Sequence, residues 1–556
     1  MKTYVKLILL LAVYILACTK ANAYDFMVDG IAYNINSDSM TVGIASGGNY
    51  IGDLSIQDSV TYQGTTYAVT TIHLGAFWQC GDLKSVSLPH TIKTIGQYAF
   101  CECSALTDVA IPNGVISIGA DAFSFCRSLE ELILPDSLNE ISYEMCYGCS
   151  NLTKVNIGNF VTKICSDAFW DCYKLNEIYL PDSVKEIEGG AFRECRSLKT
   201  VVMGNNVASI GSEAFVGCLN MEFINLSNSL LSIGSQAFAY CSKITSLKIP
   251  NHVKSLGNGS FYHCVGLKDI SLGDSIVSIG HGAFEDCTSL TKIIIPSSLR
   301  TLGRGVFGHC AKLDTIIVES GNEIFDSRND CNAVIETKTG GLIAGCMNTI
   351  IPYSIISIED YAFKRCGNLK SVDIPNSMRS IGIGAFYGCH DITHIVVSDS
   401  VTKIGEWSFY YCEGLTEITI GRGVKTIGKE AFDGCNSLKN IKCRIIYPDL
   451  VSLGANVFYY LDTYNCVLHV PKGTKNLYSK LNQWRDFRII IDDLEVPMEL
   501  GDVNGDEKVN VSDVTSLVNM ILGTTTMNQA SADVNSDGRV NVSDITALIN
   551  LILGIH

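Results

Sequence analysis

Hydrophobic and polar positions follow a pattern that repeats every 23 residues along most of the chain. Residues 95–129 contain the motif IGxxAFxxC twice at that spacing, and between the copies runs LxxVxI, in which apolar residues alternate with polar ones. Such alternation predicts a short β-strand with one buried face. Because a unit this short cannot bury its own apolar side chains, the pattern predicts coils that stack and bury one another.

The repeat keeps its register through two blocks of the chain. The phenylalanine of the AF pair stands at Phe77, Phe100, Phe123, Phe169, Phe192, Phe215, Phe238, Phe261, Phe284 and Phe307, and then at Phe363, Phe386, Phe409 and Phe432, while Cys146 replaces it once. A cysteine follows three residues later in fifteen turns, at Cys80, Cys103, Cys126, Cys149, Cys172, Cys195, Cys218, Cys241, Cys264, Cys287, Cys310, Cys366, Cys389, Cys412 and Cys435. We expect the phenylalanine rings to form a continuous buried column that dominates the energy between coils.

One unit illustrates the expected elements. Alternation places Ile293 and Ile295 on one face of a strand and Ile294 on the other, and Pro296 ends the strand. A glycine, here Gly303, then allows a tight turn. The AFxxCxxL segment that follows has spacings of three and four, which predict a helical turn or a 3₁₀ segment.

These units resemble the BspA-like, or Treponema-type, leucine-rich repeats of bacterial surface proteins, and the resemblance covers residues 52–444. It implies a mainly β solenoid, a leucine-rich repeat stack of 23-residue coils. Members of that family are mostly secreted or surface proteins, some of them adhesins for host matrix proteins or other bacteria. The resemblance implies that class of function here without naming a ligand.

The pattern divides the chain into segments. Residues 24–71 alternate like β-hairpins and form an N-terminal β cap, residues 72–444 form the repeats, and residues 445–496 form a C-terminal cap and linker. The register breaks once, which places an enlarged coil at 311–349 with a projecting hairpin that turns at Gly340 and Gly341. That hairpin is either a recognition protrusion or a plain kink in the stack.

The first 23 residues predict export. Lys2 and Lys6 precede an apolar run, and Ala21-Asn22-Ala23 fits the cleavage site of a signal peptide over residues 1–23. A rival interpretation takes residues 15–18 as a lipobox, which would make the protein a lipoprotein anchored through Cys18. We expect a secreted or cell-surface protein in either case.

Composition narrows the class of partner. The chain is 47% hydrophobic, which is enough for a buried core, and it carries a formal net charge of −16. Nucleic acids and anionic membranes need clustered Lys and Arg, and no basic run is present. The charge therefore argues against a nucleic-acid or anionic-membrane partner.

The 23 cysteines suggest metal or disulfide chemistry, but their register gives a simpler explanation. The pair Cys146 and Cys149 has CxxC spacing only because both fall on repeat positions. Cysteines in a packed column all face the same way, which favours free thiols. Two pairs outside the column are better disulfide candidates: Cys331 with Cys346, and Cys443 with Cys466.

Catalytic motifs are missing from the sequence. His263 beside Cys264 suggests a thiol nucleophile with its base, but adjacent residues point in different directions and the cysteine holds a core position. No GxSxG, HExxH, P-loop or GxGxxG motif occurs in a suitable context. The sequence predicts a protein that is not an enzyme.

The sequence pattern changes after Pro497. There the motif DxNxDxxxNxxD, followed by a predicted amphipathic helix, occurs twice, 31 residues apart. Oxygen ligands at loop positions 1, 3, 5, 7, 9 and 12 are what Ca²⁺ requires, the seventh being a backbone carbonyl. The two predicted calcium sites are Asp502, Asn504, Asp506, Lys508, Asn510 and Asp513, and Asp533, Asn535, Asp537, Arg539, Asn541 and Asp544.

This duplicated unit resembles a type I dockerin over residues 497–556, a small all-α module that binds two Ca²⁺ ions and grips a cohesin domain. The resemblance places the cohesin contacts at Val511, Ser512, Val542 and Ser543, and their near identity implies two binding orientations. Glu507 departs from the pattern at loop position 6, where the second copy has Gly538. The alternative is a calcium-stabilised tail with no cohesin partner.

Two surfaces of the stack are candidates for ligand binding. One is an aromatic row between the Phe and Cys positions: Trp78, Phe125, Tyr147, Trp170, Tyr240, Tyr262, Tyr387, Tyr410 and Tyr411. The other is the outward strand face: Glu131, Tyr179, Phe223, Lys248, Lys292, His394 and Glu417.

Three functions follow from these features. The main hypothesis is a non-enzymatic, adhesin-like protein whose repeats bind a host or bacterial surface protein or glycan and whose dockerin docks to a cohesin. The alternative is an accessory subunit of a polysaccharide-degrading, cellulosome-like assembly. In a third, the rod is only a spacer.

Overall fold

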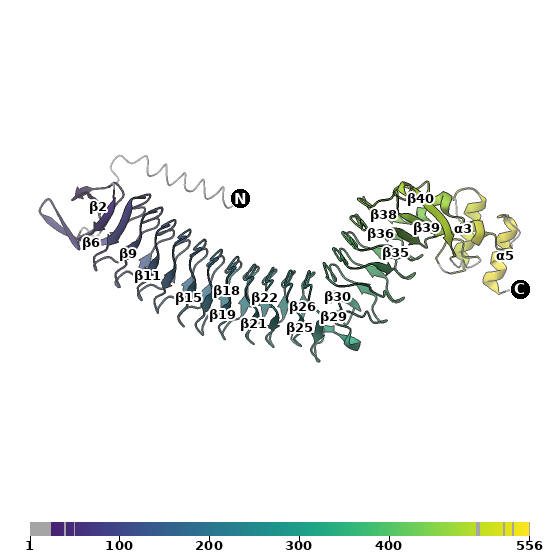
Figure 1. Ribbon diagram of the computed structural model, residues 1–556, viewed down its shortest axis with the longest axis horizontal. Helices are drawn as coiled ribbons and strands as arrows, with labels where there is room; N and C mark the ends of the chain where they lie inside the picture. Colours follow the sequence, from purple (N-terminus) through teal and green to yellow (C-terminus); the bar gives the residue numbers. More distant parts are fainter. Residues whose placement is uncertain are drawn as a thin grey trace. The chain divides into compact units, whose positions relative to one another are not determined.

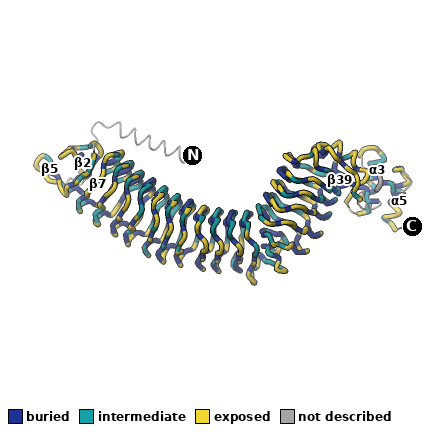
Figure 2. The backbone as a smooth tube through the Cα atoms, in the orientation of Figure 1, coloured by how far each residue is buried: buried dark blue, intermediate teal, exposed yellow. Residues whose placement is uncertain are grey.

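The computed structural model describes residues 24–37, 40–48, 50–495, 501–506, 508–525, 529–535 and 539–554 (Figure 1). The predicted signal peptide with Cys18, and also Glu507, Asp537 and Gly538, lie outside these residues. The chain forms two compact units, Met1–Leu313 with Val318–Asn322, and Asp314–Ile317 with Glu323–His556. Figure 2 shows buried and exposed residues alternating along each coil, as the pattern of the sequence requires.

The first unit is a stack of coils built on two series of parallel strands (Figure 1). The longer strands are β7 (Leu83–Ser87), β9 (Asp108–Ala110), β11 (Glu131–Ile133), β13 (Lys154–Asn156), β15 (Glu177–Tyr179), β17 (Thr200–Val202), β19 (Phe223–Asn225), β21 (Ser246–Lys248), β23 (Asp269–Ser271) and β25 (Lys292–Ile295). The shorter strands are β8 (Thr94–Ile95), β10 (Ser117–Ile118), β12 (Glu140–Ile141), β14 (Lys163–Ile164), β16 (Glu186–Ile187), β18 (Ser209–Ile210), β20 (Ser232–Ile233), β22 (Ser255–Leu256), β24 (Ser278–Ile279) and β26 (Thr301–Leu302).

Residues that pair between neighbouring strands are separated in the sequence by the repeat period. Ile187 of β16 pairs with Ile210 of β18, which pairs with Ile233 of β20, and all three are buried. In the longer series Ile293 and Ile295 are buried while Ile294 is 41% exposed, as the alternation predicts. The predicted β solenoid is confirmed.

The phenylalanine column is also confirmed. Phe215 lies 5.2 Å from Phe192 and 5.3 Å from Phe238, measured between ring centroids, and the rings are within 8° of parallel. All three rings are fully buried. The column is interrupted where Cys146 replaces phenylalanine between Phe123 and Phe169.

The AFxxCxxL segment is not helical, so the prediction of a helical or 3₁₀ turn was wrong. Glu213 and Gly217 flank Phe215 with φ of 60° and 75°, and a left-handed residue stops a right-handed helix. The N–H groups of Glu213, Phe215 and Gly217 instead donate to carbonyls one coil further on, at 2.8 to 2.9 Å. The alternate N–H groups, such as those of Val216 and Cys218, donate within the segment to Glu213 and Phe215. The segment is therefore a series of single turns that also bonds to the neighbouring coil.

Most column cysteines donate a hydrogen bond to the preceding coil. The thiol of Cys218 donates to the carbonyl of Phe192 in the preceding coil at 3.3 Å, and the same bond recurs along the column. The disulfides suggested for two pairs outside the column are wrong. Cys346 donates to the carbonyl of Asn332 instead, and Cys443 contacts the hydroxyl of Tyr478 at 3.2 Å.

We expect the column thiols to be unreactive in the native protein. Burial raises the pKa of the Cys264, Cys389 and Cys435 thiols to about 12, so at pH 8 these groups stay protonated and are poor nucleophiles. Titration with Ellman's reagent should detect mainly the half-buried Cys80 and Cys165 before unfolding, and the remaining thiols only in guanidinium. Rapid native reaction of the whole set would contradict this packing.

In the part of the chain that the structure describes, six strands precede the first full coil. They are β1 (Phe26–Val28), β2 (Ile31–Ile35), β3 (Thr41–Ile44), β4 (Gly52–Ser55), β5 (Ser59–Tyr62) and β6 (Thr65–Ile72). Antiparallel pairs β1–β2, β2–β3 and β5–β6 give way to parallel pairing of β6 with β8 and of β4 with β7. These hairpins cover the hydrophobic end that a stack of coils would otherwise expose.

The enlarged coil opens the second unit with β28 (Phe325–Asp326), η1 (Arg328–Asp330), β29 (Ala333–Glu336) and β30 (Gly341–Gly345). β29 and β30 form the predicted hairpin, and Gly340, with φ of 67°, stands at its turn. β30 then pairs in parallel with β31, through Leu342 and Ile358. The hairpin thus belongs to the sheet, as its first strands, and does not project from it.

The second unit continues with the same two series of strands. The shorter are β31 (Ser357–Ile358), β32 (Ser380–Ile381), β34 (Lys403–Ile404), β36 (Thr426–Ile427) and β38 (Ser452–Leu453). The longer are β33 (His394–Val396), β35 (Glu417–Ile420), β37 (Asn440–Cys443), β39 (Val467–Pro471) and β40 (Ile489–Leu494). Short turns η2 (Pro448–Leu450), α2 (Lys475–Tyr478) and η3 (Trp484–Asp486) close the last coils, and the rings of Tyr478 and Trp484 are buried there.

Candidate functional site

Among the described residues of the C-terminal module, the two longer helices each follow an acidic loop. α3 (Val511–Ile521) begins at a capping box in which Asn510 accepts from the Ser512 N–H and Asp513 accepts from the Asn510 N–H, at 2.8 and 2.9 Å. α5 (Val542–Leu553) begins with the same box at Asn541 and Asp544. The repeated NVSD sequence therefore gives each loop the same exit into its helix.

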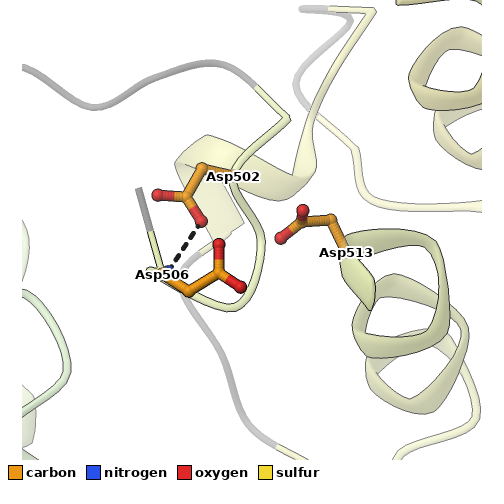
Figure 3. Close-up of side chains that lie close together, drawn as sticks. All are labelled: Asp502, Asp506 and Asp513. Carbon is orange, nitrogen blue, oxygen red and sulfur yellow. Dashed lines mark hydrogen bonds between the residues drawn. The ribbon is translucent and has the colours of Figure 1, made fainter. Parts of the chain in front are cut away.

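In the first loop three carboxylates converge (Figure 3). Oxygen atoms of Asp502, Asp506 and Asp513 lie within 4.8 Å of one another. Asp502 accepts from the N–H groups of Gly505 and Asp506, at 2.8 and 3.1 Å, so its carboxylate holds the loop around the cluster. Among the described residues this is the one group whose ligand atoms meet closely enough for a metal ion.

Asp513 is the innermost carboxylate of this group. It is fully buried, and its Oδ1 accepts from the N–H groups of Val503 and Asn504. Converging carboxylates repel unless a cation neutralises them, and oxygen donors are the ligands that Ca²⁺ prefers. The residues present fit a calcium ion.

The second loop has the same scaffold. Asp544 is fully buried and accepts from the Asn535 N–H at 3.2 Å, and the Asn535 amide donates to Ser543 at 2.7 Å, as Asn504 does to Ser512. Asp533, Arg539 and Asn541 lie along this loop as the sequence places them. Asp537, the fifth-position ligand, lies outside the described residues, so convergence of the second set is not seen.

The module has a small hydrophobic core. Its buried members are Val503, Leu517, Ala532, Val534 and Leu548, with the short helix α4 (Gln529–Ala532) contributing Ala532. The predicted partner contacts face outward: Val511 and Val542 are 71% and 67% exposed, and Ser512 and Ser543 are exposed beside them. Two equivalent faces are therefore available at the N-terminal ends of the two helices.

One neighbour of the first loop was not foreseen. The Tyr447 hydroxyl lies 3.0 Å from the Ser531 hydroxyl and donates to the Val503 carbonyl at 3.3 Å. A Cβ added to Gly505 would meet the Tyr447 ring at 2.6 Å, so only glycine fits there. Nothing in the repeat pattern marks Tyr447, since it follows the last regular coil.

The outward strand face lies where the pattern predicts it. Tyr179 and Phe223 are 56% and 55% exposed, and Glu131, Lys248, Lys292 and His394 are exposed as well. Glu417 is half-buried because Lys442 pairs with it at 2.8 Å.

The aromatic row is divided between packing and exposure. Tyr147 contacts Phe125 edge to face and Trp170 at a tilt of 34°, in both cases with centroids 4.8 Å apart. The Arg193 guanidinium lies over the Trp170 ring at 5.0 Å. This part of the row is packing between coils. Two other members of the row are exposed: Tyr240, in the first unit, by 41% and Tyr411, in the second unit, by 39%.

Comparison with protein families decides the class of the repeats. The model of the BspA type leucine rich repeat region matches residues 70–199, 162–272, 208–332 and 345–465, which is more than half of the chain. The chain belongs to the BspA type leucine-rich repeat family. The predicted resemblance is therefore confirmed.

The C-terminal module of this BspA type protein matches the dockerin type I domain over residues 500–553. Dockerins of this type are calcium-binding modules, in agreement with the acidic group at Asp502, Asp506 and Asp513. Leucine-rich repeats and dockerins are both protein-interaction modules without catalysis of their own.

Solved structures of bacterial leucine-rich repeat proteins are also similar to the chain. A leucine-rich repeat protein from Bacteroides ovatus is 26% identical, with a TM-score of 0.46 and 84% of this chain and 98% of that chain covered. A leucine-rich cell surface protein from Faecalibacterium prausnitzii is 24% identical over 75% and 94% of the two chains, with a TM-score of 0.32. The pneumococcal vaccine antigen PcpA is 16% identical over 84% and 98%, with a TM-score of 0.39.

No curated protein matches the chain. Among the residues that the structure describes, no helix has the length and apolar character needed to cross a bilayer.

Proposed function

We propose that this chain is an exported, non-enzymatic recognition protein. Its repeats bind a protein or glycan on a host or bacterial surface, and its dockerin docks to a cohesin. The single observation that supports docking is the pair of equivalent faces at Val511 and Val542, each more than two-thirds exposed beside a capped, calcium-type loop. An apolar side chain so exposed beside a polar rim is typical of a protein contact.

The dockerin holds two Ca²⁺ ions in this proposal. The first is bound by Asp502, Asn504, Asp506, the Lys508 carbonyl, Asn510 and Asp513, and the second by Asp533, Asn535, Asp537, the Arg539 carbonyl, Asn541 and Asp544. Each ion offsets the repulsion within its loop and so holds α3 or α5 against the small core. Val511 and Ser512, or Val542 and Ser543, then meet the cohesin.

The segments take the following roles in the proposal. A signal peptide occupies residues 1–23, caps occupy 24–71 and 445–496, the repeats occupy 72–444 with the enlarged coil at 311–349, and the dockerin occupies 497–556. Export leaves the protein secreted or held at the cell surface, in the second case through Cys18 if that residue is lipidated. Proteins with these two kinds of module are typically extracellular, which supports this localisation.

The second candidate function is an accessory subunit of a polysaccharide-degrading, cellulosome-like assembly. It is favoured by a cluster of accessible tyrosines around Asp433 on the second unit. In that case the dockerin recruits the chain to enzymes and the repeats contribute glycan binding.

Capture on an immobilised type I cohesin tests docking. We expect the full chain to bind in calcium and to be released by EDTA. Because the two faces are equivalent, Val511→Asp with Ser512→Asp should leave capture intact, as should Val542→Asp with Ser543→Asp, whereas the fourfold variant should lose it.

The matched control is Leu522→Asp, which alters another apolar side chain of the dockerin, 70% exposed at the C-cap of α3, the opposite end of that helix from Val511. It should bind like the unaltered chain. Capture of the fourfold variant, or capture that persists in EDTA, would show that these faces do not dock.

A further inference from the structure

Tyrosines gather at one edge of the last coils of the second unit. The residue that directly follows the column phenylalanine is Tyr387, Tyr410, Asp433 and Tyr459 in four successive coils. Tyr387 and Tyr410 are stacked, with centroids 5.2 Å apart and an interplanar angle of 22°. Asp433 is therefore a short side chain in a row of aromatic ones, with Tyr410 in the coil before it and Tyr459 in the coil after it.

The position that follows alternates between glycine and tyrosine in the same four coils. Its residues are Gly388, Tyr411, Gly434 and Tyr460. A Cβ at Gly434, which has φ of 74°, would lie 2.9 Å from the Tyr411 ring, so that ring packs over the glycine beside Asp433. Tyr459 and Tyr460 lie with centroids 4.3 Å apart.

These rings remain accessible although each has a neighbour. Tyr411, Tyr459 and Tyr460 are 39%, 50% and 68% exposed. A packing role alone would bury them, as it buries the phenylalanine column. The exposed rings therefore come from the coils on either side of Asp433, Tyr411 from the coil before it and Tyr459 and Tyr460 from the coil after it.

Asp433 is the unusual group in this cluster. It is 3% exposed, and its Oδ1 accepts no hydrogen bond in the structure. Burial and the neighbouring Glu430 raise the pKa of its carboxyl, which agrees with a carboxylate short of donors. A buried acceptor without a donor costs stability, and such groups in native proteins commonly mark a place where a ligand or water supplies the donor.

We propose that this edge, formed by Tyr410, Tyr411, Asp433, Tyr459 and Tyr460, is a binding site for a neutral polysaccharide. The apolar face of a sugar ring stacks on an exposed tyrosine ring, and a sugar hydroxyl donates to the Asp433 carboxylate, a charge-assisted bond. Side-chain rotation of the half-exposed Tyr459 or Tyr460 opens the way to Asp433. A ligand rich in hydroxyl donors and without charge fits both the aromatic faces and the lone acceptor.

This site deepens the proposed function, on which it rests, because it names the ligand class of the repeats. A peptide partner fits less well, since the edge combines exposed tyrosine rings with a buried acceptor, and a ligand rich in hydroxyl donors satisfies both. Glu430 is already engaged, accepting from the Trp407 indole N–H at 2.8 Å.

Isothermal titration of the full chain with cellohexaose, xylohexaose and mannohexaose, in EDTA, tests the proposal. We expect saturable binding of at least one hexasaccharide. Tyr460→Ala and Asp433→Asn should each raise the dissociation constant about tenfold or more. Because EDTA removes calcium from the dockerin, sugar binding in this titration reports on the repeats alone. A titration without binding would overturn the polysaccharide site and would not bear on cohesin capture, which is measured in calcium.

Tyr353→Ala is the matched control, since Tyr353 is 88% exposed in the same unit and lies outside the cluster. It should bind like the unaltered chain, and thermal unfolding should show that all variants are folded. Absence of saturable binding to all three sugars would overturn the proposal. Unchanged affinity of the Tyr460→Ala and Asp433→Asn variants for the sugar would overturn it as well.

Discussion

Replacing Phe215 by alanine is expected to destabilise the first unit by about 3 to 5 kcal/mol. The ring is fully buried and stacks on Phe192 and Phe238 at 5.2 and 5.3 Å. Truncation therefore removes apolar contacts with two coils at once and leaves a cavity between them. In a stack where each coil is stabilised only by its neighbours, that loss weakens two interfaces.

Guanidinium denaturation followed by tryptophan fluorescence or circular dichroism measures this effect as a lower midpoint. Phe160→Ala is the matched control, because Phe160 is 69% exposed and its truncation should change the unfolding free energy by no more than about 0.5 kcal/mol. Equal effects of the two substitutions would contradict the central role of the column.

Removal of calcium is expected to unfold the dockerin while the coils stay folded. Three carboxylates lie within 4.8 Å of one another in the first loop, and among the described residues of the module the hydrophobic core has five buried members. A calcium ion present at a hundredfold excess over its dissociation constant stabilises the folded form by about 2.7 kcal/mol at each site. A core this small has little stability to replace that contribution.

Hydrogen exchange with and without EDTA measures the result. Amides of α3 and α5 should lose protection in EDTA, whereas those of β16, β18 and β20 serve as the internal control and should not change. Asp513→Asn should produce the same loss in α3 even with calcium present, because Asp513 is the buried carboxylate of the first loop. Full protection of both helices in EDTA would exclude a structural role for the ion.

Much of the architecture was predictable because its causes are local or strictly periodic. The spacing of 23 residues sets the strand register, since a residue such as Ile210 must lie beside its counterpart one period away. The alternation at Ile293, Ile294 and Ile295 sets which faces are buried. The capping boxes of the dockerin are equally local, because each involves residues only three apart.

Other features depend on contacts between residues far apart in the sequence, which a local pattern does not predict. The AFxxCxxL spacing suited a helix, but its N–H groups bond to the next coil, and left-handed residues at Glu213 and Gly217 prevent helix formation. The disulfide candidates were plausible from redox compartment alone, but Cys443 is placed beside Tyr478, thirty-five residues further on. Whether a thiol meets another thiol is decided by packing.

The sequence by itself determined the repeat, the buried column and the oxygen-rich loops of the C-terminal module, because in each of them the same residue types recur at a constant spacing. Only the tertiary structure decided which aromatic side chains are consumed by packing, as at Trp170, and which stay accessible, as at Tyr460. It alone revealed that Asp433 is buried and that its Oδ1 has no hydrogen-bond donor. The physical reason is that a side chain's exposure and hydrogen bonds depend on the particular neighbours that stacking brings beside it from other coils.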